Sequence, residues 1–470
     1  MLVKITKTRP NDRVFLHVAG AGIAPASGGY EPPEVLLLYP AVLRYVSPYH
    51  IAQYSCNPQK EGVVWAVWYT TGMTHAHVLR SMLLLACMTG LALPAPAAFG
   101  AILYGSEHRE RLERARAEDA NRPWLLSYYV GYHHDLMKPR DIDYSLMTHI
   151  AVGGVGVNVD GTLREHWHMP DGGGRVMALE VGRRAERAGV KRLIWLGGPN
   201  EEDRFLSASS DQYRAQFVRN VVRLVHELGY DGVDVNWEPI RPKDEAGIYA
   251  LVRDLRLAAP NMLISVPVNW VPTTILTRKD LSLYPRLARY ADRLFIMSYS
   301  MAGPWPGWQS WHGGALTGDT FTTPGSVRTS VRAYERAGVP TEKLGIGIGT
   351  YATCWQYPIV RPRQTVPSGF APTQLRVMNM RTLMGEYYDR RHERWDHVAQ
   401  TPYLSFPTPQ GSQGCGFISY ENERSVQAKM QLVRDRGLGG ALVWNIGTGY
   451  FPNETRGREH TLLRATHGVF

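Results

Sequence analysis

The octet DGVDVNWE occupies residues 231–238. Successive side chains of a β-strand point to opposite faces, so Asp234, Asn236 and Glu238 share one face, while two valines and a tryptophan share the other. The apolar face suits contact with surrounding helices. The polar face then points into the interior of the fold, where a charge is costly unless it is used or paired. A solvated edge strand is the competing interpretation, but the octet directly follows a helical pattern. We therefore predict a functional strand inside an α/β fold.

Short apolar runs alternate with amphipathic stretches from residue 124 onward, in the rhythm of repeated strand–helix units. Helical patterns such as residues 212–229 and 425–437 each close at a glycine, as helix ends often do. Eight buried parallel strands predict a (β/α)8 TIM barrel, whose active site lies at the carboxyl ends of the strands. The long gap before the last run predicts a small inserted α+β subdomain at about residues 352–420. The eight runs are residues 125–132, 147–155, 191–198, 230–238, 262–269, 293–300, 344–350 and 439–446.

The composition of the 470 residues is that of a globular protein, with 44% hydrophobic and 20% charged residues. These values exclude a disordered chain and a many-span membrane protein. The net charge of +10 is spread along the chain without a basic tract, so we expect neither nucleic acid nor a stable membrane partner. The 13 tryptophans and 25 tyrosines favour a carbohydrate-binding cleft, because flat aromatic faces stack on sugar rings.

Residues 73–97 have the parts of a secretory signal peptide. Arg80 precedes an apolar run at residues 82–93, and an A-x-A cleavage pattern follows it. We therefore expect a secreted or periplasmic protein that starts at Met73, with residues 1–72 left unassigned. A buried helix of an amino-terminal domain is the alternative interpretation of the same stretch.

The segment after the expected signal is rich in charge. Residues 98–123 contain many Glu and Arg residues, which predicts a charged linker or solvated helix. The barrel domain is expected to occupy residues 124–470.

Cysteine spacing gives no support to a structural zinc site, because Cys56, Cys87, Cys354 and Cys415 form no C-x-x-C pair. Cleavage after Ala97 would leave Cys354 and Cys415, and export makes a disulfide between them possible. Cys87 also fits a lipoprotein processing box, which is an alternative use of the leader.

No metal or cofactor is expected. The histidine pairs His133/His134 and His166/His168 have no carboxylate or cysteine partner in the sequence pattern. The glycines at residues 153–156 lack the third glycine of a dinucleotide-binding loop.

The octet resembles the D-G-x-D-x-D-x-E signature of glycoside hydrolase family 18, which contains chitinases and endo-β-N-acetylglucosaminidases. Four further segments are similar to motifs of that family, in the same order. LIWLGG (193–198) resembles the third-strand S-x-G-G, with Trp195 where serine is usual, and FIMSYSMAGPW (295–305) resembles the sixth-strand M-T/S-Y-D. Residues 338–351 resemble the approach to the seventh strand, and residues 417–444 resemble the last helix and strand.

This resemblance implies a substrate-assisted mechanism, an exception to the two-carboxylate scheme. Glu238 would protonate the glycosidic oxygen, and the 2-acetamido oxygen of the substrate would attack C1 with overall retention. Tyr299 would bond the acetamido oxygen, and Trp444 would lie under the sugar. Asp231 and Asp234 would organise the strand and its charge, and Asp234 would help to raise the pKa of Glu238.

Two residues depart from the family pattern. Asn236 replaces the Asp that orients the acetamide and balances the positive oxazolinium, and Ser300 replaces the Asp of the sixth-strand motif. The Asn236 amide still accepts a hydrogen bond but brings no full charge, so the resemblance implies a slow enzyme. An Asn-x-Glu pair is nevertheless similar to that of the endo-β-N-acetylglucosaminidases of family 85.

Aromatic residues at strand ends and on the loop after the sixth strand are candidates for sugar stacking. Three tryptophans on this loop follow one another at three-residue spacing, and the third is Trp311. Self-packing of a loop rich in proline and glycine is the alternative interpretation. The predicted substrate-binding residues besides Trp444 are Tyr132, Trp270, Met297, Trp305, Trp308 and Tyr351.

The sequence therefore predicts a secreted, monomeric glycosidase that hydrolyses β-1,4-linked N-acetylglucosamine in chitin or chito-oligosaccharides. A sugar-binding protein without turnover on the same barrel is the first alternative. An enzyme that cuts the core of N-glycans, or the glycan of peptidoglycan, is the second.

Overall fold

The computed structural model describes residues 2–6, 15–19, 49–53, 66–70, 106–119, 122–169, 172–275, 280–455 and 457–468. The chain divides into two units, Met1–Leu91 and Ala92–Phe470. In the first unit, β1 (Leu2–Thr6) pairs antiparallel with β2 (Phe15–Ala19), and β3 (Tyr49–Gln53) with β4 (Ala66–Thr70). The expected signal peptide at residues 73–97 lies outside the described residues. Within the described part of the chain, no helix combines the length and apolar character needed to cross a bilayer.

Eight parallel strands of the second unit form a closed barrel, which confirms the predicted TIM-barrel class. Each predicted apolar run overlaps one strand, and β5 closes the barrel by pairing with both β18 and β6. A two-residue strand, β7 (Leu163–Arg164), extends β6 antiparallel. The barrel strands are β5 (Trp124–Val130), β6 (His149–Val157), β8 (Lys191–Pro199), β9 (Gly232–Glu238), β10 (Leu263–Val268), β11 (Arg293–Ile296), β12 (Leu344–Gly349) and β18 (Gly440–Trp444).

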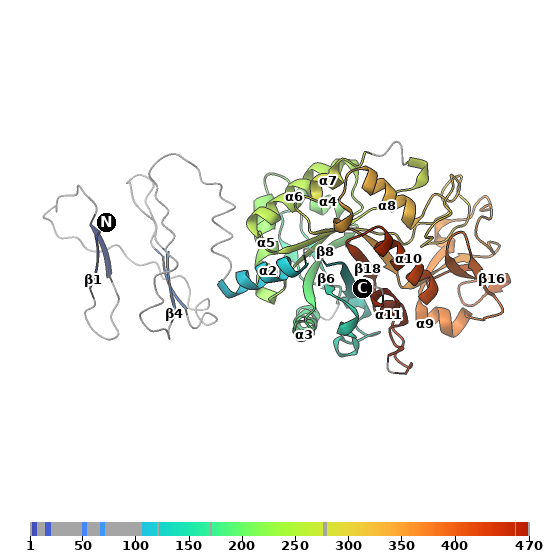
Figure 1. Ribbon diagram of the computed structural model, residues 1–470, viewed down its shortest axis with the longest axis horizontal. Helices are drawn as coiled ribbons and strands as arrows, with labels where there is room; N and C mark the ends of the chain where they lie inside the picture. The colour runs from blue at the N-terminus through green and yellow to red at the C-terminus, as the bar shows by residue number, and fades with distance from the viewer. Residues whose placement is uncertain are drawn as a thin grey trace. The chain divides into compact units, whose positions relative to one another are not determined.

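Helices between the strands surround the barrel (Figure 1). The two expected helical patterns correspond to α5, which ends at Gly229 in the left-handed conformation, and α10, which Asn422 caps by accepting from the Ser425 N–H. The helices are α3 (Gly174–Arg187), α4 (Glu202–Ala208), α5 (Arg214–Leu228), α6 (Glu245–Ala258), α7 (Leu283–Leu287), α8 (Val327–Arg336), α10 (Glu423–Asp435) and α11 (Thr461–His467).

Strand β12 leaves space for large aromatic rings in the barrel interior. A Cβ at Gly347 would lie 2.7 Å from the Tyr299 ring, and one at Gly345 would overlap the Phe295 ring. The sequence LGIGIG therefore alternates isoleucine toward the helices with glycine toward the interior. These glycines allow Tyr299 to reach the centre of the barrel mouth.

The predicted insertion between the seventh and eighth barrel strands is an antiparallel sheet that lies beside the barrel (Figure 1). Its strands run in the order β14-β13-β17-β16-β15, and α9 (Met380–Thr382) with a π-helical turn (Leu383–Tyr387) follows β14. The strands are β13 (Tyr351–Gln356), β14 (Leu375–Asn379), β15 (Glu393–Asp396), β16 (Thr401–Gln410) and β17 (Cys415–Ser419).

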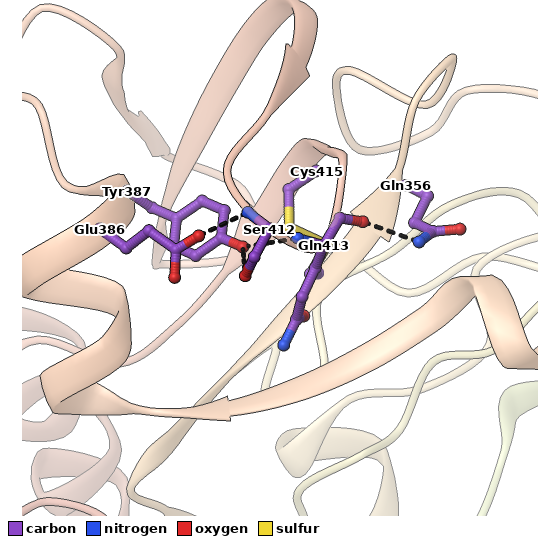
Figure 2. Close-up of a disulfide and its surroundings, with 7 residues drawn as sticks. Gln356, Glu386, Tyr387, Ser412, Gln413 and Cys415 are labelled. Atoms are coloured by element: carbon purple, nitrogen blue, oxygen red, sulfur yellow. Dashed lines mark hydrogen bonds between the residues drawn. A yellow bond between two sulfur atoms is a disulfide. The ribbon is translucent and has the colours of Figure 1, made fainter.

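A disulfide joins Cys354 to Cys415 between the neighbouring strands β13 and β17. Both cysteines are buried. Hydrogen bonds hold the turn before Cys415 in place: the Gln356 side chain donates to the Gln413 carbonyl over 2.7 Å, and the Gln413 N–H donates to the Tyr387 hydroxyl over 3.0 Å (Figure 2). The bridge closes a long loop of the insertion.

We expect the double substitution Cys354→Ser and Cys415→Ser to lower the free energy of unfolding by about 2 to 4 kcal/mol, because the unfolded chain loses the constraint of a closed loop. The loop spans a sequence separation of 61 residues. Urea unfolding without reductant measures the difference. Reductant should bring the parent protein to the stability of the variant and leave the variant unchanged. Equal stability of the two proteins without reductant would contradict the prediction.

Helix α2 (Ser106–Asp119), within the expected charged linker, packs on the amino-terminal ends of several barrel strands. Arg116 Nε lies 3.2 Å from the carboxylate of Asp292, which precedes β11, and Glu118 lies 3.0 Å from Lys191 at the start of β8. Leu112 is buried on the same helix. Helix α2 therefore contacts the end of the barrel opposite the carboxyl ends of the strands.

Candidate active site

Strand β9 presents three polar side chains to the barrel interior at its carboxyl end. Asp234 is completely buried, Asn236 is 3% exposed, and Glu238 is partly exposed at the end of the strand. Trp237 faces the other way and stacks on Phe205 of α4 with the ring centroids 4.9 Å apart. The alternation of side chains thus brings the three polar groups together at successive levels below the barrel mouth.

Asp234 accepts a hydrogen bond on each carboxylate oxygen. The Tyr128 hydroxyl donates to one oxygen and the Ser265 hydroxyl to the other, both over 2.6 Å. Burial raises the pKa of Asp234 to about 7, although both hydrogen bonds favour the charged form. Asp234 therefore exchanges its proton near neutral pH.

Glu238 has the electrostatic character of a general acid. Burial raises the pKa of the Glu238 carboxyl, and a hydrogen bond with the Asn236 side chain partly opposes that rise. The Asn236 Oδ1 atom is buried and has no hydrogen-bond partner among the described residues. The site thus pairs a proton-holding carboxyl with an acceptor that is available to a ligand.

Tyr299 and Trp444 border the same space. Burial raises the pKa of Tyr299 well above its usual value, and the charge of Glu238 raises it further, so the phenol stays protonated and can donate a hydrogen bond. The Trp444 ring packs edge-on against Tyr128, with the ring centroids 5.2 Å apart. Met297, which is 7% exposed, lies two residues before Tyr299.

A polar pocket connects the barrel mouth to the inserted sheet. Ser300 and Tyr351 share a hydrogen bond of 2.6 Å between their hydroxyl groups. Thr353 and Ser419 of the insertion line the same pocket. Glu421, also in the lining, is neutralised by the buried Lys429 ammonium. The pocket therefore presents mainly hydroxyl groups.

The sequence model of glycosyl hydrolases family 18 matches residues 125–449. The chain belongs to this family.

Curated relatives carry chitinase names. The chain is 28% identical over 365 residues to a probable endochitinase of Caenorhabditis elegans. This alignment covers 71% of this chain and 57% of that protein. The chain is 24% identical over 351 residues to probable chitinase 10 of Drosophila melanogaster. This alignment covers 70% of this chain and 15% of that protein. The chain thus spans little more than half of the first relative and a small part of the second.

A solved structure shares the fold. The Group IV chitinase of Ostrinia furnacalis in complex with allosamidin superposes with a TM-score of 0.62 at 24% identity, covering 74% of this chain and 98% of that chain. At this identity the similarity demonstrates a common architecture.

Asp231 lies at the other end of the barrel from Glu238. Asp231 precedes β9 at its amino-terminal end, where its carboxylate accepts from the Arg192 N–H and the Arg192 guanidinium, each over 2.8 Å, and from Arg111 of α2. These cations hold the pKa of Asp231 below its usual value despite burial. Asp231 therefore lies apart from Asp234, Asn236 and Glu238, and its contacts join strands β8 and β9 at the far end of the barrel.

Of the four tryptophans predicted to stack on sugars after strands β10 and β11, three form one cluster at the rim. Trp308 contacts both Trp270 and Trp305, with ring centroids 6.2 Å and 4.6 Å apart, and Trp305 is 45% exposed. Trp311 is buried instead, and its indole N–H donates to the Gly325 carbonyl over 2.8 Å. Trp311 therefore stabilises the loop.

Tyr132 stands at another part of the rim and is 50% exposed. Its ring lies 4.5 Å from His133 and 5.8 Å from His168, measured between centroids. Burial lowers the pKa of both histidines, which therefore present neutral imidazoles. His133 in turn contacts Asn445, directly after Trp444, over 3.0 Å.

Tyr128 and Ser265 were not among the residues predicted from the sequence, although both bind Asp234. The alternation of side chains along the strand could have identified them. Each lies inside a predicted strand at a position whose side chain points away from the surrounding helices. A polar residue in the inward phase of a barrel strand is therefore a candidate partner for a buried carboxylate.

We expect Ser265→Ala to raise the pKa of Asp234 by about one pH unit, because the carboxylate loses a donor that favours its charged form. The pKa rises because the Ser265 hydroxyl stabilises the Asp234 carboxylate, and without it the carboxyl ionises at a higher pH. A ¹³C NMR titration of the Asp234 carboxyl measures this pKa without requiring activity. Ser127→Ala is the matched control, because Ser127 is equally buried in β5 and its hydroxyl has no partner among the described residues. An unchanged titration in Ser265→Ala would contradict the assigned hydrogen bond.

Proposed function

We propose that this protein is a retaining glycosidase that hydrolyses β-1,4-linked N-acetylglucosamine in chitin or chito-oligosaccharides, with Glu238 as acid and base. The observation that carries the proposal is the buried column of Asp234, Asn236 and Glu238 on β9, in which burial raises the pKa of both carboxyls. The chitinase names of the relatives support the substrate class.

In the first step, Glu238 donates its proton to the glycosidic oxygen as the bond to C1 breaks. The 2-acetamido oxygen of the same sugar attacks C1 and forms an oxazolinium, so the substrate supplies the nucleophile. Asn236 Oδ1 accepts the acetamide N–H, and the Tyr299 hydroxyl donates to the acetamide oxygen. Both contacts orient the group for attack.

In the second step, the Glu238 carboxylate takes a proton from water, and the resulting hydroxide equivalent attacks C1 to open the oxazolinium with retention. Asp234 lies two levels below Glu238 and exchanges its proton near neutral pH. When ionised, Asp234 balances the cationic intermediate with its negative charge.

The glycan would extend over the aromatic rim. Trp444 supports the sugar at the cleavage point, and Trp270, Trp305 and Trp308 offer ring faces and edges to sugars further along the chain. Tyr132, Met297 and Tyr351 complete the proposed contacts.

A sugar-binding protein without turnover is the second candidate. Asn236 and Ser300 favour it, because neither carries the charge found at that position in the family motif. Cleavage of N-glycan cores or of peptidoglycan is the third and uses the same chemistry.

We also propose that the protein is exported and acts as a monomer. The Cys354–Cys415 disulfide supports export, because disulfides persist mainly in oxidising compartments. The pattern between Arg80 and Ala97 supports the same conclusion.

Incubation of the purified protein with chitotetraose and, separately, with a high-mannose glycopeptide tests the function. Mass spectrometry of the products should reveal shorter N-acetylglucosamine oligomers and an intact glycopeptide. Cleavage of the glycopeptide alone would favour the N-glycan substrate. Binding of chitotetraose without products would favour the sugar-binding protein.

A further inference from the structure

Trp195 occupies the barrel interior where the related motif carries a small serine. It lies on β8 directly beside Asp234 of β9 in the strand register, and it is 2% exposed. Because register neighbours on parallel strands point to the same face, its ring enters the same layer of the interior as the Asp234 carboxyl. A large indole therefore borders the catalytic column.

The surroundings of Trp195 are the aromatic residues of the site. Its ring packs edge-to-face with Trp444, with centroids 5.2 Å apart and an interplanar angle of 82°. Tyr128, the partner of Asp234, lies 6.0 Å away, and His168 at the rim lies 5.2 Å away. Trp195 thus touches the residue proposed to support the sugar.

The indole N–H of Trp195 is a buried donor without a hydrogen-bond partner in the described part of the chain. A Cβ on Gly198 would lie 3.0 Å from Cζ2 and 3.7 Å from Cε2 of this ring. The Cε2 atom is bonded to Nε1, so Gly198, near the carboxyl end of β8, lies beside the part of the ring that adjoins the donor. A buried donor left unpaired costs free energy that a ligand acceptor would recover.

An acceptor of the same kind lies on the adjacent strand. Asn236 Oδ1 is buried and unpartnered among the described residues, and Asn236 pairs in register with Gly197, two residues after Trp195. One free donor and one free acceptor at adjacent levels complement an amide group, which brings one carbonyl oxygen and one N–H.

We propose that Trp195 is a substrate-binding residue that selects for the 2-acylamino group, its indole N–H donating to the amide oxygen while Asn236 accepts the amide N–H. This inference rests on the proposed function, since it assumes that an N-acetylated sugar occupies the site. The amide oxygen has two lone pairs and therefore accepts from both Trp195 and Tyr299. Selection follows because an unacylated sugar leaves both buried groups of the protein unpaired.

Calorimetric titration in a Glu238→Gln background, which prevents turnover, tests the inference. The two ligands are chitotetraose and its fully de-N-acetylated counterpart. We expect Trp195→Phe, which removes the N–H and keeps an aromatic ring, to weaken chitotetraose binding about 3- to 10-fold and to leave the affinity for the de-N-acetylated ligand unchanged. Trp395→Phe is the matched control, because the Trp395 indole N–H on the inserted sheet is also buried and unpartnered among the described residues.

A second measurement does not depend on the variant folding correctly. In the ¹⁵N-labelled Glu238→Gln protein, the Trp195 indole resonance should move downfield on addition of chitotetraose, while the Trp395 resonance stays in place. Equal weakening of both ligands by Trp195→Phe, or a stationary Trp195 resonance at saturation, would overturn the inference and leave the proposed function standing. Failure of both the parent protein and the Glu238→Gln protein to bind chitotetraose would overturn both.

Discussion

Glu238→Gln is expected to lower kcat for chitotetraose hydrolysis by about 10²- to 10⁴-fold, which is the typical contribution of a positioned general acid. Glutamine has nearly the same shape as a protonated glutamate but cannot transfer its amide proton to the leaving oxygen. Oligosaccharide binding should survive, because the barrel mouth and its aromatic residues are unchanged. Single-turnover cleavage followed by mass spectrometry, together with calorimetric binding, measures both quantities.

The control for this substitution is Glu342→Gln, the same chemical change at an exposed glutamate just before β12, at the amino-terminal end of the barrel. It should retain full activity. Turnover by Glu238→Gln equal to that of the parent protein would remove Glu238 from the acid role. Loss of both binding and turnover would instead indicate a damaged site.

The second large effect concerns Asn236, where the chain departs from the family motif. If a missing charge slows the enzyme, Asn236→Asp places a carboxylate opposite the acetamido nitrogen and stabilises the cationic intermediate. One electrostatic stabiliser of this kind lowers the activation free energy by about 3 kcal/mol, so kcat should rise by up to about 10²-fold. The rate of chitotetraose cleavage between about pH 4 and 9 is the measurement.

The pH profile should change together with the rate. A carboxylate at residue 236 lies between Asp234, whose pKa is about 7, and Glu238, whose pKa burial also raises. Adding negative charge disfavours ionisation of its neighbours, so the basic limb of the profile should move to higher pH.

The outcomes separate the three candidate interpretations of the site. A gain in rate identifies a hydrolase slowed by a missing charge. A loss of activity shows a site built around asparagine and contradicts the expected gain. Absence of turnover in both forms, with binding retained, identifies a sugar-binding protein. Asn453→Asp in an exposed turn is the control and should change neither the rate nor the profile.

Much of the fold was predictable because it depends on local periodicity. The run LGIGIG was identified as a strand from its apolar character, and the position of β12 agrees with it. The inserted subdomain was predicted as α+β but without its individual strands, because antiparallel pairing between β13 and β17 joins segments about 60 residues apart. The spacing of the three tryptophans after β11 did not predict which of them are exposed, because the burial of Trp311 depends on the packing of the loop.

The sequence by itself determined which residues of β9 face inward, since the direction of a side chain along a strand is a local property of the backbone. It also determined the family motif and the order of the eight strands. It did not separate Asp231 from Glu238, although seven residues of strand place them about 23 Å apart, at opposite ends of the barrel. Only the tertiary structure decided that Tyr128 and Ser265 reach Asp234 from β5 and β10, and that the Trp195 indole N–H and the Asn236 Oδ1 atom have no hydrogen-bond partner among the described residues. Such contacts depend on how the closed barrel brings distant strands together, and no local pattern encodes that closure.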